Sequence, residues 1–215
     1  MADQDPKTDA REVRQRILNA AAALFAAEGY HQTSTREIAL AARIDQPALF
    51  HHFASKAEIM NTILKHDLGA AVEAAEHQLR SDSSPALRLY RYLAQDVGMA
   101  CRSPYAVGIN GTARLLKELD FAGARARSQR LTDARVAMIQ QGIGAGEFVD
   151  VDPHSASRAI EWTIEGSLAD IGTAGVDDPE AAAREVAGLC LRALLVDPSQ
   201  LEEIRQRAAA EGGAE

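Results

Sequence analysis

Apolar residues recur every three or four positions along most of the chain, the spacing that places side chains on one face of an α-helix. The first such segment predicts a helix from about residue 8 to Glu28, and Gly29, which follows it, suits a helix end with positive φ. Its apolar face comprises Val13, Ile17, Ala20, Ala21, Leu24 and Phe25. No segment alternates apolar and polar residues as a strand does, so the pattern predicts an all-α protein.

Two short helices follow, and each begins at a capping residue. Ser34 and Glu37 form a capping box, in which the hydroxyl accepts a hydrogen bond from a free helix amide and the carboxylate reaches back. Asp45 caps the next helix, and a second Ser-x-x-Glu box opens a longer helix over residues 55–80. These features predict a compact helical head.

The remainder of the chain stays helical, with breaks at prolines and glycines. Its predicted helices cover 85–101, 104–118, 121–144, 153–171, 179–196 and a polar tail over 198–210. We therefore expect a disordered lead-in over 1–10, a compact helical head over 11–56 and a helical body over 57–210.

Charge is unevenly distributed between these parts. The 215 residues carry a net charge of −8, whereas residues 1–56 hold seven basic and seven acidic residues. The acidic excess therefore lies in the body, and the neutral head can present a basic face locally.

The two cysteines, Cys101 and Cys190, match neither a disulfide framework nor a metal-ligand spacing. No apolar run reaches the length of a membrane span, and the polar N-terminus does not resemble a signal peptide. We expect a cytoplasmic protein without a metal or other cofactor and without a membrane partner.

Two short helices joined by a tight turn and braced by a third predict a helix-turn-helix, whose second helix enters the major groove of DNA. Gln46 stands at the start of that helix and can pair with adenine, while Ala48 can touch a thymine methyl group. Arg36, in the first turn of the preceding helix, can reach guanine or a phosphate. His51, His52 and Lys56 are expected at backbone phosphates.

Residues 11–66 resemble the DNA-binding domain of the tetracycline-repressor (TetR) family of bacterial regulators. The stretches that carry the resemblance are ILNAAAALFAAEGYHQTSTREIA (17–39) and IDQPALFHHFASK (44–56). The resemblance implies a dimer that binds a palindromic operator, usually as a repressor, and an all-helical body that binds a small inducer. It also implies DNA contacts at Thr35, Arg36, Gln46, Pro47, Ala48, His51, His52 and Lys56.

The sequence departs from the family pattern at two positions. Arg43 stands in the turn where the family usually has Gly, and a left-handed conformation there costs about 1 kcal/mol. The turn is therefore either reshaped, or Arg43 offsets this cost by touching a phosphate. Phe50 stands where the family usually has Tyr, and it lacks the hydroxyl that would bind a phosphate. These departures support an alternative, a helical protein-interaction module that has lost DNA binding.

The body is expected to dimerise and to bind the inducer. Apolar stripes on its last two major helices predict the dimer interface, although they could instead face their own core. These residues are Ile160, Ile164, Leu168, Val186, Leu189, Cys190, Ala193 and Leu194. Large or adaptable side chains that could line a pocket for an apolar or aromatic ligand, or else belong to the core, are Tyr90, Met99, Tyr105, Leu116 and Trp162.

Enzyme classes find no support in the sequence. It has no nucleophile elbow, no phosphate-binding glycine loop after a strand, and no HExxH motif. The adjacent His51 and His52 diverge by about 100° on a helix and cannot easily share one metal ion. We therefore predict a regulator and not an enzyme.

Overall fold

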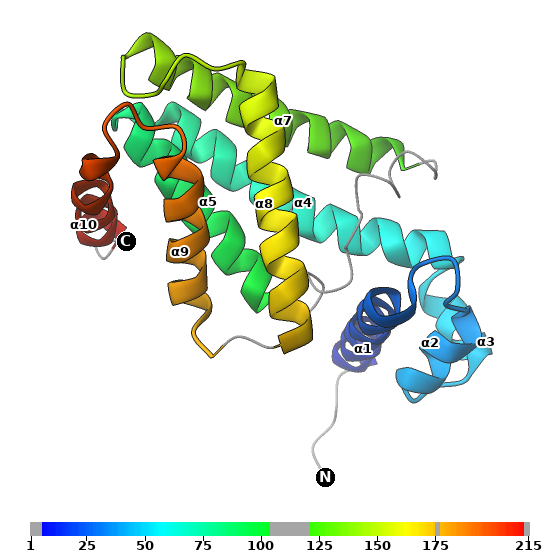
Figure 1. The fold of residues 1–215 in the computed structure, drawn as a ribbon. Coiled ribbons are helices and arrows are strands. Elements are labelled where there is room, and N and C mark those ends of the chain that lie inside the picture. The colour runs from blue at the N-terminus through cyan, green and yellow to red at the C-terminus, as the bar shows by residue number, and fades with distance from the viewer. Residues whose placement is uncertain (1–5, 104–120, 175–176, 213–215) are drawn as a thin grey trace. The chain divides into compact units, whose positions relative to one another are not determined.

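The computed structural model describes residues 6–103, 121–174 and 177–212 (Figure 1). Every regular element within these ranges is a helix, and the one β-type pairing is an isolated bridge between Phe148 and Leu195. The all-α prediction is therefore confirmed. The helices are α1 (Pro6–Glu28), α2 (Thr35–Ala41), α3 (Gln46–His52), α4 (Lys56–Arg80), α5 (Pro85–Arg102), α7 (Ala122–Gly144), α8 (Pro153–Ala174), α9 (Pro179–Arg192), the short 3₁₀ helix η2 (Pro198–Gln200) and α10 (Leu201–Gly212).

The observed helices follow the predicted ones and differ from them mainly at their ends. Helix α1 begins at Pro6, so residues 6–10 are helical where an irregular lead-in was expected. Helix α9 ends at Arg192, before the predicted end at residue 196. The helix expected over 104–118 lies outside the described residues.

The chain packs as two compact units, which divide within α4 after Asp67. The first unit is the head and holds α1 to α3 with the start of α4. The first turns of α4 contribute buried side chains. The buried side chains of that segment are Ile59, Met60, Ile63 and Leu64.

Local capping explains why the head helices begin and end where they do. The capping box at α2 is complete: Glu37 N donates to Ser34 Oγ at 3.2 Å, and Ser34 N donates to Glu37 Oε2 at 2.7 Å. At α3, Ala48 N donates to Asp45 Oδ1 at 2.8 Å. Helix α1 ends at Gly29, whose φ of 88° is the positive value that the sequence predicted.

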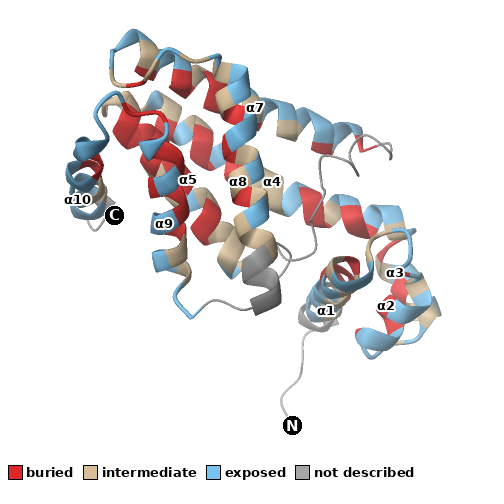
Figure 2. Cartoon of the chain, viewed as in Figure 1, coloured by how far each residue is buried: buried red, intermediate tan, exposed pale blue. Residues whose placement is uncertain are grey.

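The second unit is the body, and α5 is its central helix. Helix α5 carries a row of buried side chains that includes Leu87, Leu89, Tyr92, Leu93 and Val97 (Figure 2). It packs most extensively along α9, and also against α8 and α10. The apolar core of the body therefore gathers around α5.

Candidate nucleic-acid interface

The turn between α2 and α3 is tight even though it contains Arg43 in place of glycine. Arg43 has a φ of 58°, which lies in the left-handed region. Its N–H donates to Leu40 O at 3.1 Å, and the N–H of Ile44 donates to Ala39 O at 3.0 Å. The turn therefore keeps the geometry that glycine would adopt, and the side chain of Arg43 makes this conformation cost about 1 kcal/mol.

The starts of α2 and α3 are linked by a side-chain hydrogen bond. Gln46 Nε2 donates to Thr35 Oγ1 at 2.9 Å. The carboxamide of Gln46 has a second N–H and a carbonyl oxygen besides, so the bond to Thr35 orients the amide and leaves its adenine-pairing groups available.

None of the eight residues expected at DNA is buried. Arg36, Pro47 and His51 are exposed, and the other five are partly exposed. In contrast, Leu49 and Phe53 are 0% and 1% exposed and anchor this part of the chain in the head core. The helix therefore separates a buried anchoring side from an open side that carries most of the predicted contacts.

Lys56 has a structural task that the sequence did not reveal. Its ammonium group donates to Tyr30 O at 2.6 Å and to Thr33 O at 2.7 Å, and it lies 4.4 Å from the centroid of the Tyr30 ring. Burial lowers the pKa of Lys56, while the nearby carboxylate of Glu37 opposes this shift. The lysine thus fastens the loop before α2, and its contact with phosphate stays a prediction.

Arg14 provides a second brace that sequence reasoning missed. Its Nη1 donates to His52 O at 2.8 Å, and its guanidinium carbon lies 3.9 Å from the centroid of the Phe53 ring. Because Arg14 belongs to α1, the last turn of α3 is held by the first helix. The spacing of 38 residues between Arg14 and His52 leaves no local signal for this contact.

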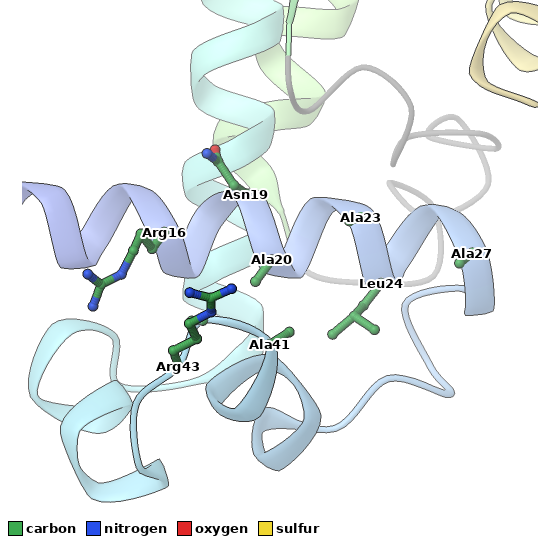
Figure 3. Close-up of a pocket in the computed structure, with 9 residues that line it drawn as sticks. Arg16, Asn19, Ala20, Ala23, Leu24, Ala27, Ala41 and Arg43 are labelled. Atoms are coloured by element: carbon green, nitrogen blue, oxygen red, sulfur yellow. The ribbon is translucent and has the colours of Figure 1, made fainter. Parts of the chain in front are cut away.

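An open groove runs along α1 beside the turn after α2. Figure 3 shows small side chains along it, with Arg16 and Arg43 toward one end. Leu24 is the largest apolar side chain in its lining. A small-molecule site normally buries most of its ligand, so this shallow surface on the head is a poor candidate for the inducer site. The residues that line the groove are Arg16, Asn19, Ala20, Ala23, Leu24, Ala27, Ala41, Ala42 and Arg43.

In the body, a buried polar network joins α5, α7 and α8. Tyr92 Oη donates to Asp96 Oδ2 at 3.0 Å. Arg135, 3% exposed, donates from Nε to Ser157 Oγ at 3.2 Å and from Nη2 to Glu161 Oε2 at 3.1 Å. Burial raises the pKa of the Asp96 carboxyl, and the positive charge of Arg135 only partly offsets that effect.

Three of the five predicted ligand-contacting residues lie in the part of the chain that the structure describes. Tyr90 is 2% exposed within the body core, and its hydroxyl has no hydrogen-bond partner among the described residues. Met99 packs at the edge of the same core. Trp162 is 68% exposed, so no pocket encloses it in the single chain, and its contact with a ligand stays a prediction. Tyr105 and Leu116 lie outside the described residues.

The predicted dimer stripes mostly face the chain's own core. Leu168 is partly buried against that core, whereas Leu189 is 62% exposed and Ala193 is exposed. Five of these residues are buried in the core of the single chain, which is the alternative that their spacing left open, and their part in a dimer interface stays a prediction. They are Ile160, Ile164, Val186, Cys190 and Leu194.

Exposed apolar and small residues lie on the side of α8 that faces away from the core. Trp162 stands two residues from both Ile160 and Ile164, so it points away from the buried side of α8. Ala159 and Gly166, about one turn before and after Trp162, are exposed small residues. We call these three residues of α8, with the exposed Leu189 on the neighbouring α9, the Trp162 face.

Metal sites and membrane spans find no support in the part of the chain that the structure describes. No cluster of three His, Cys, Asp or Glu residues there is arranged to hold a metal ion. None of the described helices combines the length and the hydropathy that crossing a membrane requires.

Comparison with known proteins bears on the head and on the whole chain. A family model for bacterial regulatory proteins of the tetR family matches residues 17–63. The HTH-type transcriptional repressor KstR2 of Mycolicibacterium smegmatis is 30% identical over 159 residues, which cover 71% of this chain and 76% of that protein.

Two solved structures extend the similarity to both units. Mycobacterium smegmatis AmtR superposes with a TM-score of 0.74 at 27% identity, over 94% of this chain and 95% of that one. PfmR from Thermus thermophilus gives a TM-score of 0.69 at 29% identity, over 82% of this chain and 97% of that one.

Proposed function

Because the chain belongs to the TetR family of bacterial transcriptional regulators, we propose that it is a homodimeric repressor that binds a palindromic operator and releases it when a small molecule binds the body. The observation that carries this proposal is the open side of α2, α3 and the start of α4. All eight side chains that the family resemblance assigns to DNA have exposed surface there, and the apolar anchors of α3 point the other way.

DNA recognition is assigned to α3 in the major groove. Gln46 pairs with adenine, and Arg36 reaches guanine or a phosphate from the first turn of α2. Pro47 and Ala48 offer small apolar surfaces to the groove. His51, His52 and Lys56 contact phosphates and set the position of the head on the duplex. The protein acts in the cytoplasm, where bacterial operators lie.

Dimerisation is assigned to the Trp162 face. One head makes too few contacts for tight specific binding, whereas two heads spaced about one turn of DNA apart read both half-sites. Trp162 and Leu189 are large apolar side chains on adjacent helices, and exposed aromatic residues are enriched at protein interfaces. Ala159 and Gly166 let a helix of the second copy approach closely.

Binding of the inducer is assigned to the body. Leaving a buried hydroxyl without a partner costs about 1–3 kcal/mol, so the hydroxyl of Tyr90 is a favourable hydrogen-bonding point for a ligand that enters the apolar core. A mainly apolar or aromatic molecule suits such surroundings. DNA is released if the ligand binds more tightly to a dimer whose two heads are wrongly spaced for DNA. By the same coupling, bound DNA lowers the affinity for the ligand. The repressor KstR2, to which the chain is similar, agrees with the proposed sign of regulation.

Selection of bound fragments from random duplex DNA tests the proposal. The expected result is a two-fold symmetric motif, bound by two chains, with an affinity that falls steeply with salt because phosphate contacts release counterions. Gln46→Ala and Arg36→Ala are expected to lose about 1–3 kcal/mol of binding free energy and to relax one base position each.

The interaction-module alternative makes the opposite prediction. Leu40 is 78% exposed on α2 and offers an apolar point to a protein partner. Under this alternative, no motif is recovered even at low salt. The left-handed Arg43 weakens the alternative, because the helix-turn-helix geometry survives the loss of glycine.

A further inference from the structure

Phe50 is an exposed aromatic side chain on the proposed recognition helix. It is 46% exposed, whereas the neighbouring Leu49 is fully buried. The fold of α3 therefore does not depend on Phe50, and its apolar surface faces water in the free protein. A large apolar side chain in that position contributes hydrophobic stabilisation only when a binding partner removes it from water.

The position of Phe50 relates it to the residues proposed to read bases. Residues four apart on a helix share a face, so Phe50 stands above Gln46. Pro47, three residues before Phe50, is also exposed. The phenyl ring has no donor or acceptor and cannot bind a phosphate as a tyrosine hydroxyl would.

The major groove offers one apolar group to such a ring, the C5-methyl group of thymine. We propose that Phe50 determines specificity by packing against the methyl group of a thymine next to the base that Gln46 reads. The proposal rests on the DNA-binding function proposed above. It assigns a preference for thymine to the residue that departs from the usual tyrosine.

Deoxyuridine provides the test, because it pairs as thymine does but lacks the methyl group. Each thymine of the selected half-site is replaced singly by deoxyuridine, and affinity for the full-length protein is measured at fixed salt. Loss of one buried methyl contact corresponds to about a fourfold weaker affinity per half-site. At one position we expect this loss with the natural protein and no loss with Phe50→Ala.

Three variants sharpen the comparison. Phe50→Leu keeps an apolar contact and is expected to retain part of the uridine effect. Phe50→Tyr is expected to keep the effect and to leave the salt dependence of binding unchanged, because its hydroxyl carries no charge. Leu40→Ala removes another exposed apolar side chain of the head, outside α3, and is expected to leave the uridine effect unchanged. Thermal unfolding of each variant checks that the head remains folded.

The outcomes separate this proposal from the function on which it rests. If the protein binds its operator but tolerates uridine at every position, the methyl contact is overturned and DNA binding stands. An equal uridine loss in Phe50→Ala would assign the methyl contact to another residue, such as Ala48, and would also overturn the proposal. Failure to bind any duplex would overturn the proposed function itself.

Discussion

The side-chain amide of Gln46 is tied to the hydroxyl of Thr35 by a hydrogen bond of 2.9 Å, so the first residue of α3 is held by the first residue of α2. This bond fixes the direction of an amide that would otherwise rotate in water. The Gln46 amide has therefore already lost part of its rotational freedom before it meets the adenine proposed as its partner, which lowers the entropy cost of binding.

Replacing Thr35 with Val keeps the shape of the side chain but removes the acceptor for Gln46. We expect operator affinity to fall about three- to tenfold, which corresponds to about 1 kcal/mol for one hydrogen bond. Preference for adenine at the position read by Gln46 should weaken as well. Fluorescence anisotropy with operator variants measures both effects. Thr35→Ser retains the hydroxyl as a control, and an equal loss in Ser and Val would contradict the orienting role.

Arg43→Gly tests the cost of the left-handed turn. Glycine adopts a positive φ without steric conflict, so the free energy of unfolding of the head should rise by about 1 kcal/mol. Chemical denaturation measures this change. If Arg43 also contacts phosphate, the same variant should bind all duplexes more weakly, with a shallower salt dependence. A destabilised Arg43→Gly variant would show that the turn is not strained in the way described.

Asp96→Asn tests the buried network through pH. The pKa of Asp96 is raised by burial, so the folded state holds its proton more tightly than the unfolded state. Its contribution to stability is therefore present below the ordinary aspartate pKa and is lost as pH rises through the raised value. Asparagine does not titrate.

Relative to the natural protein, the Asp96→Asn variant should therefore gain stability as pH rises upward from about 4. Denaturant titrations across this range give the difference in unfolding free energy at each pH. Glu202→Gln, on exposed α10, is a control for general effects of charge. A difference that shrinks with rising pH would mean that ion pairing with Arg135 outweighs the burial of Asp96.

Trp162→Lys tests the proposed dimer face. Because the side chain is 68% exposed in a single chain, its replacement should leave the body folded but place a charge in the interface. The molecular mass measured by sedimentation should change from that of two chains to that of one. Operator affinity should drop by more than about a hundredfold, because the two half-sites are then bound by separate chains.

A matched variant is Leu40→Lys, which adds the same charge at an exposed apolar position of the head. It should sediment as the natural protein does. Dimers that persist in Trp162→Lys and also in Leu189→Lys would place the interface elsewhere.

Sequence alone predicted what depends on neighbours along the chain. The caps at Ser34 and Asp45 and the positive φ at Gly29 involve residues within three or four positions, and the structure confirms them. Contacts between distant residues carried no such signal. Lys56 finds carbonyl groups 23 and 26 residues earlier, and Arg135 meets Glu161 after 26 residues.

The apolar stripe predicted on α8 shows a second limit of sequence patterns. The stripe containing Ile160 and Ile164 was correctly recognised as apolar, but periodicity shows only that one side is covered and not what covers it. Trp162 lies off that stripe, and this placement was readable from its spacing alone. An exposed tryptophan opposite a complete core stripe is the feature on which the proposed dimer face rests.

The division of α3 between anchors and open positions has a consequence for how such a regulator changes over time. Leu49 alone among the residues of α3 is buried, together with Phe53 just beyond it, and both secure the helix from below. Gln46, Pro47, Phe50 and His51 can then be substituted as a group with little penalty to folding. New operators become accessible by exchanging a few residues on a scaffold that stays intact.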